Sequence, residues 1–224
     1  MNISVIVPAL NEESVIGKTL SNLTSHHQPH EVIVVDGGSR DQTRDIAIAS
    51  GFAKVISSEP GRARQMNLGA KQTSGDVLLF LHADTKLPKN ALEIIRQKIE
   101  NQSFKAGRFR LKFDEEKWLL RFFASYTRFH SFSYGDQAFF VTRSLFDSIG
   151  GFREDVPFED IEFYKRLRKI TRPVIIKEPV ITSARRFTSV GCMKQKFINL
   201  FLVGLYYAGW DVLSFKEKWY PDVR

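Results

Sequence analysis

A chain of 224 residues with 43% hydrophobic and 26% charged side chains can bury one sizeable core, which excludes a disordered or fibrous protein. Its formal net charge of +8 favours an anionic partner, such as nucleotide phosphates, nucleic acid or an acidic membrane surface. The single Cys192 excludes an internal disulfide framework, and the N-terminus lacks the features of a signal peptide. We therefore expect a cytoplasmic protein.

Strand-like and helix-like patterns alternate through the first hundred residues. Short apolar runs at 3–7, 32–35, 54–56 and 77–81 are each followed by apolar residues at helical spacing, over 15–23, 46–49, 66–70 and 92–99. Repeated strand–helix units predict a mainly parallel sheet with right-handed crossovers and helices on both faces. The predicted fold class is α/β.

A different rhythm begins after about residue 101. Over 104–113, Phe109 and Leu111 alternate with Arg108 and Arg110, which predicts a half-exposed strand that runs antiparallel to the preceding ones and begins a mixed edge. Since no Gly- or Ser-rich linker separates the two parts, we expect one catalytic domain over 1–190, with halves 1–101 and 102–190. Residues 191–224 then form a C-terminal helical extension.

Two acidic side chains follow buried strand patterns in the first half. Asp36 ends the run at 32–35, and Asp84 comes shortly after the run at 77–81. Open parallel sheets bind ligands beyond the carboxyl ends of their strands, so both carboxylates are expected beside a substrate. The pair predicts a site for a nucleotide and a metal ion.

Two loops near these strand ends carry further candidate ligands. The segment 8–12, Pro-Ala-Leu-Asn-Glu, offers Asn11 and Glu12 to sugar hydroxyls or base edges, although Asn11 is equally suited to cap a helix. Gly37 lets the backbone approach a ligand beside Asp36, or it forms only a turn. Both alternatives remain open at this point.

Cations and a possible metal site follow in the chain. Arg62 and Arg64 open the third helix, where they bind a diphosphate or form a solvated basic turn. His82 and Asp84 are one residue apart, so in extended chain both face one divalent cation. Alternatively, Asp84 caps a helix and His82 is a core histidine.

The order of six motifs resembles the family-2 glycosyltransferases, which have the Rossmann-like GT-A fold. The matching segments together cover roughly residues 3–187 and are VIVPALNEE at 5–13, VDGGSRDQT at 35–43, GRARQMNLGA at 61–70, FLHADT at 80–85, YGDQAFFVTR at 134–143 and FEDIEFYKRL at 158–167. The histidine in the fourth motif and the arginine pair at 185–186 look most like a small bacterial subgroup associated with radical-SAM and selenium genes.

The resemblance implies an inverting, metal-assisted transfer from a UDP- or GDP-linked sugar. It gives donor contacts to one set of residues, namely Pro8, Ala9, Leu10, Asn11, Glu12, Asp36, Gly37 and Arg64. It also makes Asp84 the metal ligand and Asp160 the general base, with Glu159 as the alternative base. His82 stands where the usual Asp-x-Asp motif has an acid, which favours Mn²⁺ over Mg²⁺.

Two pairs of residues are expected on the acceptor side. Asp136 binds an acceptor hydroxyl, with Gln137 beside it, or the two belong to a turn before a strand at 138–141. Arg185 and Arg186 contact the diphosphate or an anionic acceptor, or form an exposed basic turn.

The C-terminal segment 197–213 contains an apolar run too short to span a bilayer. It is expected in a homodimer interface, against the catalytic core, or at a membrane surface. A non-catalytic protein of the same fold that binds nucleotide sugar or a membrane surface is the alternative to an enzyme. Nucleic acid is not an expected partner, because the aromatic residues lie in apolar runs instead of alternating with Lys and Arg.

Overall fold

Parallel strands and helices alternate from the N-terminus, as the sequence pattern predicts. The computed structural model describes residues 1–101, 103–131, 133, 135–210 and 212. Its first half comprises β1 (Ile3–Ala9), α1 (Ile16–His26), β2 (Glu31–Asp36), α2 (Thr43–Ala49), β3 (Lys54–Ser57), α3 (Arg62–Lys71), β4 (Val77–Phe80), β5 (Thr85–Lys86) and α4 (Ala91–Glu100). The second half adds β6 (Ala106–Phe113), α5 (Trp118–Ser125), the short turns η1 (Tyr126–Arg128) and η2 (Gly135–Gln137), β7 (Phe139–Thr142), α6 (Arg143–Ser148), α7 (Glu159–Ile170), β8 (Val174–Thr182), α8 (Arg185–Val190) and α9 (Cys192–Tyr207).

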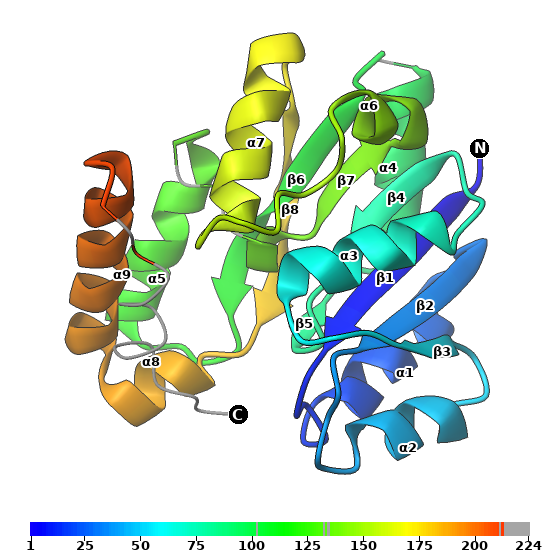
Figure 1. The fold of residues 1–224 in the computed structure, drawn as a ribbon, viewed down its shortest axis with the longest axis horizontal. Coiled ribbons are helices and arrows are strands. Elements are labelled where there is room, and N and C mark those ends of the chain that lie inside the picture. The colour runs from blue at the N-terminus through cyan, green and yellow to red at the C-terminus, as the bar shows by residue number, and fades with distance from the viewer. Residues whose placement is uncertain (102, 132, 134, 211, 213–224) are drawn as a thin grey trace.

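One eight-stranded sheet connects both halves, in the order β3-β2-β1-β4-β7-β6-β8-β5 (Figure 1). Strands β1 to β4 are parallel, and β7 pairs antiparallel with both β4 and β6. The sheet is therefore mixed but mainly parallel, which confirms the predicted α/β class. The division of the chain at residue 101 stays a prediction.

The prediction for β6 was wrong in two respects. Strand β6 lies inside the sheet, between β7 and β8, and it runs in the same direction as β4, because β7 is the strand that reverses. Arg108 is also fully buried, although its position in the alternation predicted exposure. Its two terminal guanidinium nitrogens donate to the carbonyls of Thr127 and Phe129, each at 2.8 Å, so a charged residue occupies a core position.

Helices cover both faces of the sheet and form two separate cores. Residues at alternate strand positions, such as Val5 and Ile6, face opposite layers. The layer with α1, α2 and α4 contains Leu20 and Ile95, whereas the layer with α3, α6 and α7 contains Phe163. These layers hold the carboxyl ends of β1, β2 and β4 in a fixed arrangement.

The C-terminal helices α8 and α9 lie beside α5 at one end of the molecule (Figure 1). A small third core contains Leu111 and Leu120, with Phe123 and Phe187 packed against it. Residues 211 and 213 of the predicted 197–213 segment lie outside the described residues. Within the described part of the chain, no helix combines the length and apolarity needed to cross a membrane.

Candidate active site

A cavity of about 530 Å³ lies where the sheet halves meet α7, α8 and α9, within the size range of small-molecule sites. Its lining comes from the loop after β1, the start of α3, the turn after β4, η2 and the start of α7. Most residues predicted for the site border it, namely Pro8, Ala9, Leu10, Glu12, Arg64, His82, Asp84, Asp136, Glu159, Asp160, Arg185 and Arg186. Folding thus gathers side chains from separate motifs into one site.

Asn11 does not line this cavity, and it does not cap α1. The helix begins at Ile16, and the Asn11 side chain instead accepts a hydrogen bond from the backbone N–H of Arg40 at 2.9 Å. Asn11 has a φ of 53°, a left-handed conformation that asparagine tolerates better than most residues. Its visible role is to join the loop after β1 to the loop after β2.

Asp36 and Gly37 also lie outside the cavity lining. The Asp36 carboxylate accepts hydrogen bonds from the Ser39 hydroxyl at 2.5 Å and from the Ser39 backbone N–H at 3.2 Å. Beside it, Gln65 donates to the carbonyls of Ala9 and Val35, both at 2.8 Å. A Cβ at Gly37 would come within 3.0 Å of the Gln65 side chain, so glycine is required for close packing at this junction. The sequence reasoning missed Gln65, because a buried glutamine in a helix has no distinctive pattern.

Glu12, Asp84 and Arg185 form one charged cluster in the cavity. Arg185 Nη2 pairs with Glu12 Oε2 and lies 3.9 Å from Asp84 Oδ2. The other Asp84 oxygen accepts hydrogen bonds from the hydroxyls of Thr85 at 3.2 Å and Thr182 at 3.3 Å. Arg185 therefore partly neutralises two carboxylates that border the cavity.

The metal-site prediction assumed an extended chain between His82 and Asp84, and this assumption was wrong. The Thr85 backbone N–H donates to the His82 carbonyl at 3.1 Å, which closes a turn over these residues. The His82 ring packs against Gly135, where an added Cβ would come within 2.7 Å of Nε2. Among the described residues, no three His, Cys, Asp or Glu side chains gather to hold a metal ion by themselves.

The first turn of α7 brings two buried acids to the cavity. Asp160 is 8% exposed, and its Oδ2 accepts a hydrogen bond from the Gly135 backbone N–H at 2.6 Å. Burial raises the pKa of Asp160, and the neighbouring Glu159 carboxylate raises it further, while Arg62 acts in the opposite direction. Glu159 itself pairs with Arg62 Nη1 at 3.2 Å.

Asp136 is a second buried acid of the cavity with a perturbed pKa. Burial, followed by the charges of Asp84 and Asp160, raises the pKa of its carboxyl to about 7. Its buried Oδ1 accepts no hydrogen bond from any described residue. Gln137 is fully buried in the same turn and lies outside the cavity lining. The turn before β7 is present as η2, and Asp136 lines the cavity from it, while a contact of Asp136 with an acceptor hydroxyl stays a prediction.

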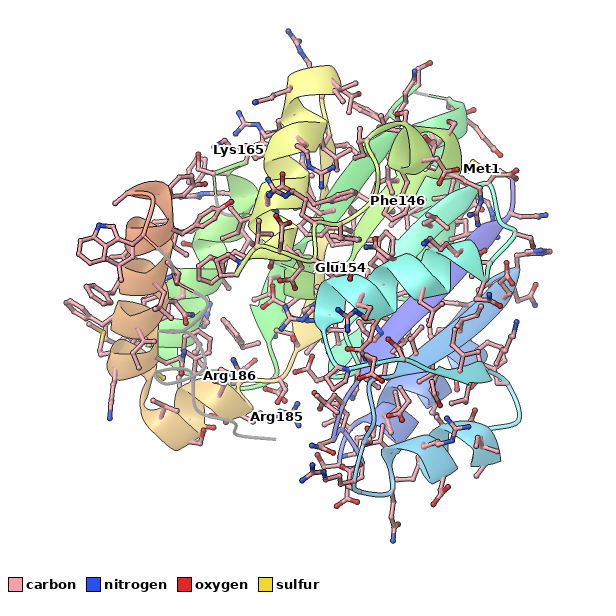
Figure 2. All side chains as sticks on the ribbon, in the orientation of Figure 1. Met1, Phe146, Glu154, Lys165, Arg185 and Arg186 are labelled. Carbon is pink, nitrogen blue, oxygen red and sulfur yellow. The ribbon has the colours of Figure 1, made fainter. Side chains whose placement is uncertain are left out.

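The two arginines at the start of α3 have different partners. Arg64 pairs with Glu154 at 3.1 Å and is about half exposed, and Figure 2 shows Glu154 beside this end of α3. Arg62 instead contacts Glu159, so it is the cation of this helix nearest the buried acids. Figure 2 also shows Arg185 and Arg186 at the start of α8, away from Glu154 and the start of α3. The sequence identified both cations of α3 but not which of them faces the acids.

The family model "Glycosyl transferase family 2" matches residues 4–153, about two thirds of the chain. This match covers the donor-side loops, the turn with His82 and Asp84, and η2 with Asp136. The chain belongs to glycosyl transferase family 2. This membership confirms the resemblance at the level of the family, and the motif at 158–167 lies beyond the matched residues.

Several curated family members are similar over parts of the chain. A 4,4'-diaponeurosporenoate glycosyltransferase of Staphylococcus haemolyticus is 37% identical over 113 residues, which are 46% of this chain and 30% of that protein. A glucosyl-3-phosphoglycerate synthase of Mycobacterium tuberculosis is 38% identical over 93 residues, which are 37% of this chain and 28% of that protein. The match therefore spans less than a third of these two relatives.

Solved structures of other proteins share the fold. A mannosyltransferase of Pyrobaculum calidifontis in complex with GDP-Man and Mn²⁺ has a TM-score of 0.64 at 22% identity, covering 81% of this chain and 56% of that one. S. aureus TarS in complex with UDP-GlcNAc has a TM-score of 0.66 at 23% identity, with coverages of 82% and 58%. At this identity the likeness establishes the GT-A type of fold alone.

Proposed function

We propose that this chain transfers a sugar from a nucleoside-diphosphate sugar to an acceptor hydroxyl, with inversion at the anomeric carbon. The observation that carries the proposal is the grouping of the acids Asp160 and Asp136 with the cations Arg185 and Arg62 in one cavity. Such a reaction needs a base for the acceptor and positive charge for the leaving diphosphate. Family membership and the nucleotide-sugar complexes of the structural neighbours support it.

Asp160 is the proposed general base. In the reaction, the acceptor oxygen bonds to the anomeric carbon, its proton passes to the Asp160 carboxylate, and the bond from that carbon to the diphosphate breaks. Burial raises the Asp160 pKa, which makes its carboxylate a better proton acceptor near neutral pH. Glu159 is less suited to this role, because it already forms an ion pair with Arg62.

The donor is proposed to lie against the loop at 8–12, with Arg64 near the diphosphate. Asp36 and Gly37 support the loop after β2, which Asn11 joins to the loop at 8–12. A divalent cation fits Asp84, since Mg²⁺ and Mn²⁺ are often held by one or two carboxylates, with substrate phosphates and water as further ligands. When bound, such a cation would neutralise charge on the departing diphosphate. His82 as a further ligand, the preference for Mn²⁺ and the radical-SAM-associated subgroup stay predictions.

A thermal-shift panel of UDP- and GDP-linked sugars, with and without Mn²⁺, tests the proposal. We expect one donor to raise the melting temperature, because a ligand that binds only the folded state stabilises it. The product of that donor should then be analysed by NMR, which we expect to show an inverted anomeric configuration. A donor that binds without any turnover would favour a non-catalytic binding protein, and no shift with any donor would contradict a nucleotide-sugar site.

A further inference from the structure

The cavity has two chemically different walls. The wall with the loop at 8–12 and the starts of α3 and α7 carries charged groups, including Arg62 and Asp160. The opposite wall is formed by β6, α5, α8 and α9. It combines a group of apolar side chains, Leu111, Phe113, Phe123, Phe187 and Val203, which we name the apolar wall, with the polar Arg185, Arg186, Lys196 and Asn199. A molecule that fills both sides must therefore have a polar part and an apolar part.

The apolar wall is held together by aromatic contacts between distant elements. The Phe187 ring lies 5.2 Å from the Phe113 ring and 6.2 Å from the Phe123 ring, between centroids. Phe123 and Phe187 are only half-buried, so part of each ring remains accessible. This wall can therefore contact a ligand without rearrangement of the small core beneath it.

Helix α9 lines the cavity with one stripe and exposes apolar side chains elsewhere. Lys196, Asn199 and Val203 line the cavity at spacings of three and four residues, which place them on one face. Phe197 and Leu200, by contrast, are 69% and 67% exposed. Large apolar side chains that remain exposed together on one helix mark a surface that binds another molecule.

The neighbouring helix α5 extends this exposed apolar surface. Its Trp118 is 76% exposed and its Phe122 is 50% exposed. Contact between Lys196 and the Phe123 ring, 5.0 Å from Nζ to centroid, connects α9 with α5. We name the exposed side chains of the two helices the α5–α9 face, which comprises Trp118, Phe122, Met193, Phe197, Leu200, Phe201 and Tyr207.

The charges around the α5–α9 face indicate what covers it. Neither helix contains an Asp or Glu, whereas Arg121 and Lys194 are exposed beside the aromatic residues. The acids just before α5, Glu115 and Glu116, pair with Lys117 and Lys112. Exposed aromatic side chains with cations and without acids are typical of segments that bind anionic lipid surfaces. A second copy of the chain would instead place these like charges together across a dimer interface.

We infer that the α5–α9 face binds an anionic lipid surface and that the acceptor is a hydroxyl group on a lipid in that surface. The apolar chain of the lipid lies against Phe123, Phe187 and Val203, and its hydroxyl reaches Asp160. This inference rests on the proposed glycosyl transfer for the role of the lipid, while the binding of the surface is independent of it.

Vesicle sedimentation with the full chain tests the surface. We expect binding to vesicles of phosphatidylcholine with 30% phosphatidylglycerol and at least about tenfold weaker binding to phosphatidylcholine alone. The double variant F197S/L200S should lose about tenfold or more of this affinity, because both side chains are exposed and apolar. The matched control I48S/I170S removes two exposed apolar residues outside this face and should bind like the parent chain.

The acceptor is tested with vesicles that also contain monoacylglycerol as a model lipid alcohol. With the donor found by thermal shift, we expect sugar incorporation into this lipid to exceed incorporation into free glycerol by at least about tenfold. Val203→Trp should reduce incorporation by filling the apolar wall, while the donor-induced shift remains. Equal sugar incorporation into glycerol and into the lipid would overturn the inference. Unchanged vesicle binding by F197S/L200S would also overturn it, as would a dimer of the parent chain that this variant dissociates. Failure of the proposed function would differ, because either no donor would bind or a bound donor would be transferred to neither the lipid nor glycerol.

Discussion

Arg185 and Glu12 form an ion pair although 173 positions separate them in the sequence. The pair joins the start of α8 to the loop after β1, and both side chains line the cavity. Asp84 Oδ2 lies 3.9 Å from the same Arg185 nitrogen. One guanidinium thus lies between the two acids closest to the proposed diphosphate position.

Arg185→Gln should weaken donor binding by about 10- to 100-fold, since it removes one charge-assisted partner and leaves two neighbouring carboxylates without compensation. Isothermal titration with the nucleotide sugar found by thermal shift measures the effect. Arg44→Gln is the control, because this exposed arginine contacts Ser57 on the far side of the sheet. Equal affinities for the Arg185 variant and the parent chain would exclude a role for Arg185 in donor binding.

Asp160→Asn should reduce sugar transfer by at least about 100-fold, which is the scale of general-base catalysis. The amide oxygen still accepts the hydrogen bond from the Gly135 N–H, so donor affinity should remain within a few-fold. A coupled assay for released nucleoside diphosphate gives the rate, and thermal shift gives the binding. If Glu159→Gln lowers the rate more than Asp160→Asn does, Glu159 is the base instead.

Asp136 should give the folded protein a specific dependence on pH. Its pKa is about 7 in the folded state and near 4 in the unfolded chain, so folding favours its protonated form. The resulting stabilisation is complete below about pH 4 and is lost as the pH rises through 7, with a total of at most about 4 kcal/mol.

Asp136→Asn removes this titration, so the variant should gain stability over the parent chain as the pH rises. Urea unfolding in chelator-containing buffers at intervals from pH 4 to pH 8 measures the difference. Asp160 also titrates nearby with a raised pKa, and the comparison of variant with parent separates the two groups. A difference that stays constant across this range would show that the Asp136 pKa is not raised.

Arg108→Met should lower the free energy of unfolding by about 2–4 kcal/mol. The substitution leaves the buried carbonyls of Thr127 and Phe129 without their donors, and each loss costs about 1–3 kcal/mol. Urea denaturation measures the change. Arg121→Met, on the exposed side of α5, should remain within about 0.5 kcal/mol of the parent. Similar values for both variants would mean that the Arg108 contacts contribute little.

The sequence determined the parallel half of the fold and the types of side chain in the site. Apolar runs such as the one before Asp36 and the one before Asp84 have the lengths and spacing of buried strands, and a strand end is a local feature. A turn before a strand was also one of the two alternatives for Asp136, and η2 is such a turn. These features depend on residues close in the chain.

The tertiary structure decided which side chains meet and which ones are buried. The sequence could not reveal that β6 lies inside the sheet, because strand order depends on pairing between distant segments. It could not show that Arg62 and not Arg64 contacts Glu159, since the two arginines differ only in their direction from the helix. Nor could the sequence reveal that the pKa of Asp136 is raised. Desolvation and neighbouring charges act on this carboxyl only when residues from separate segments share one cavity.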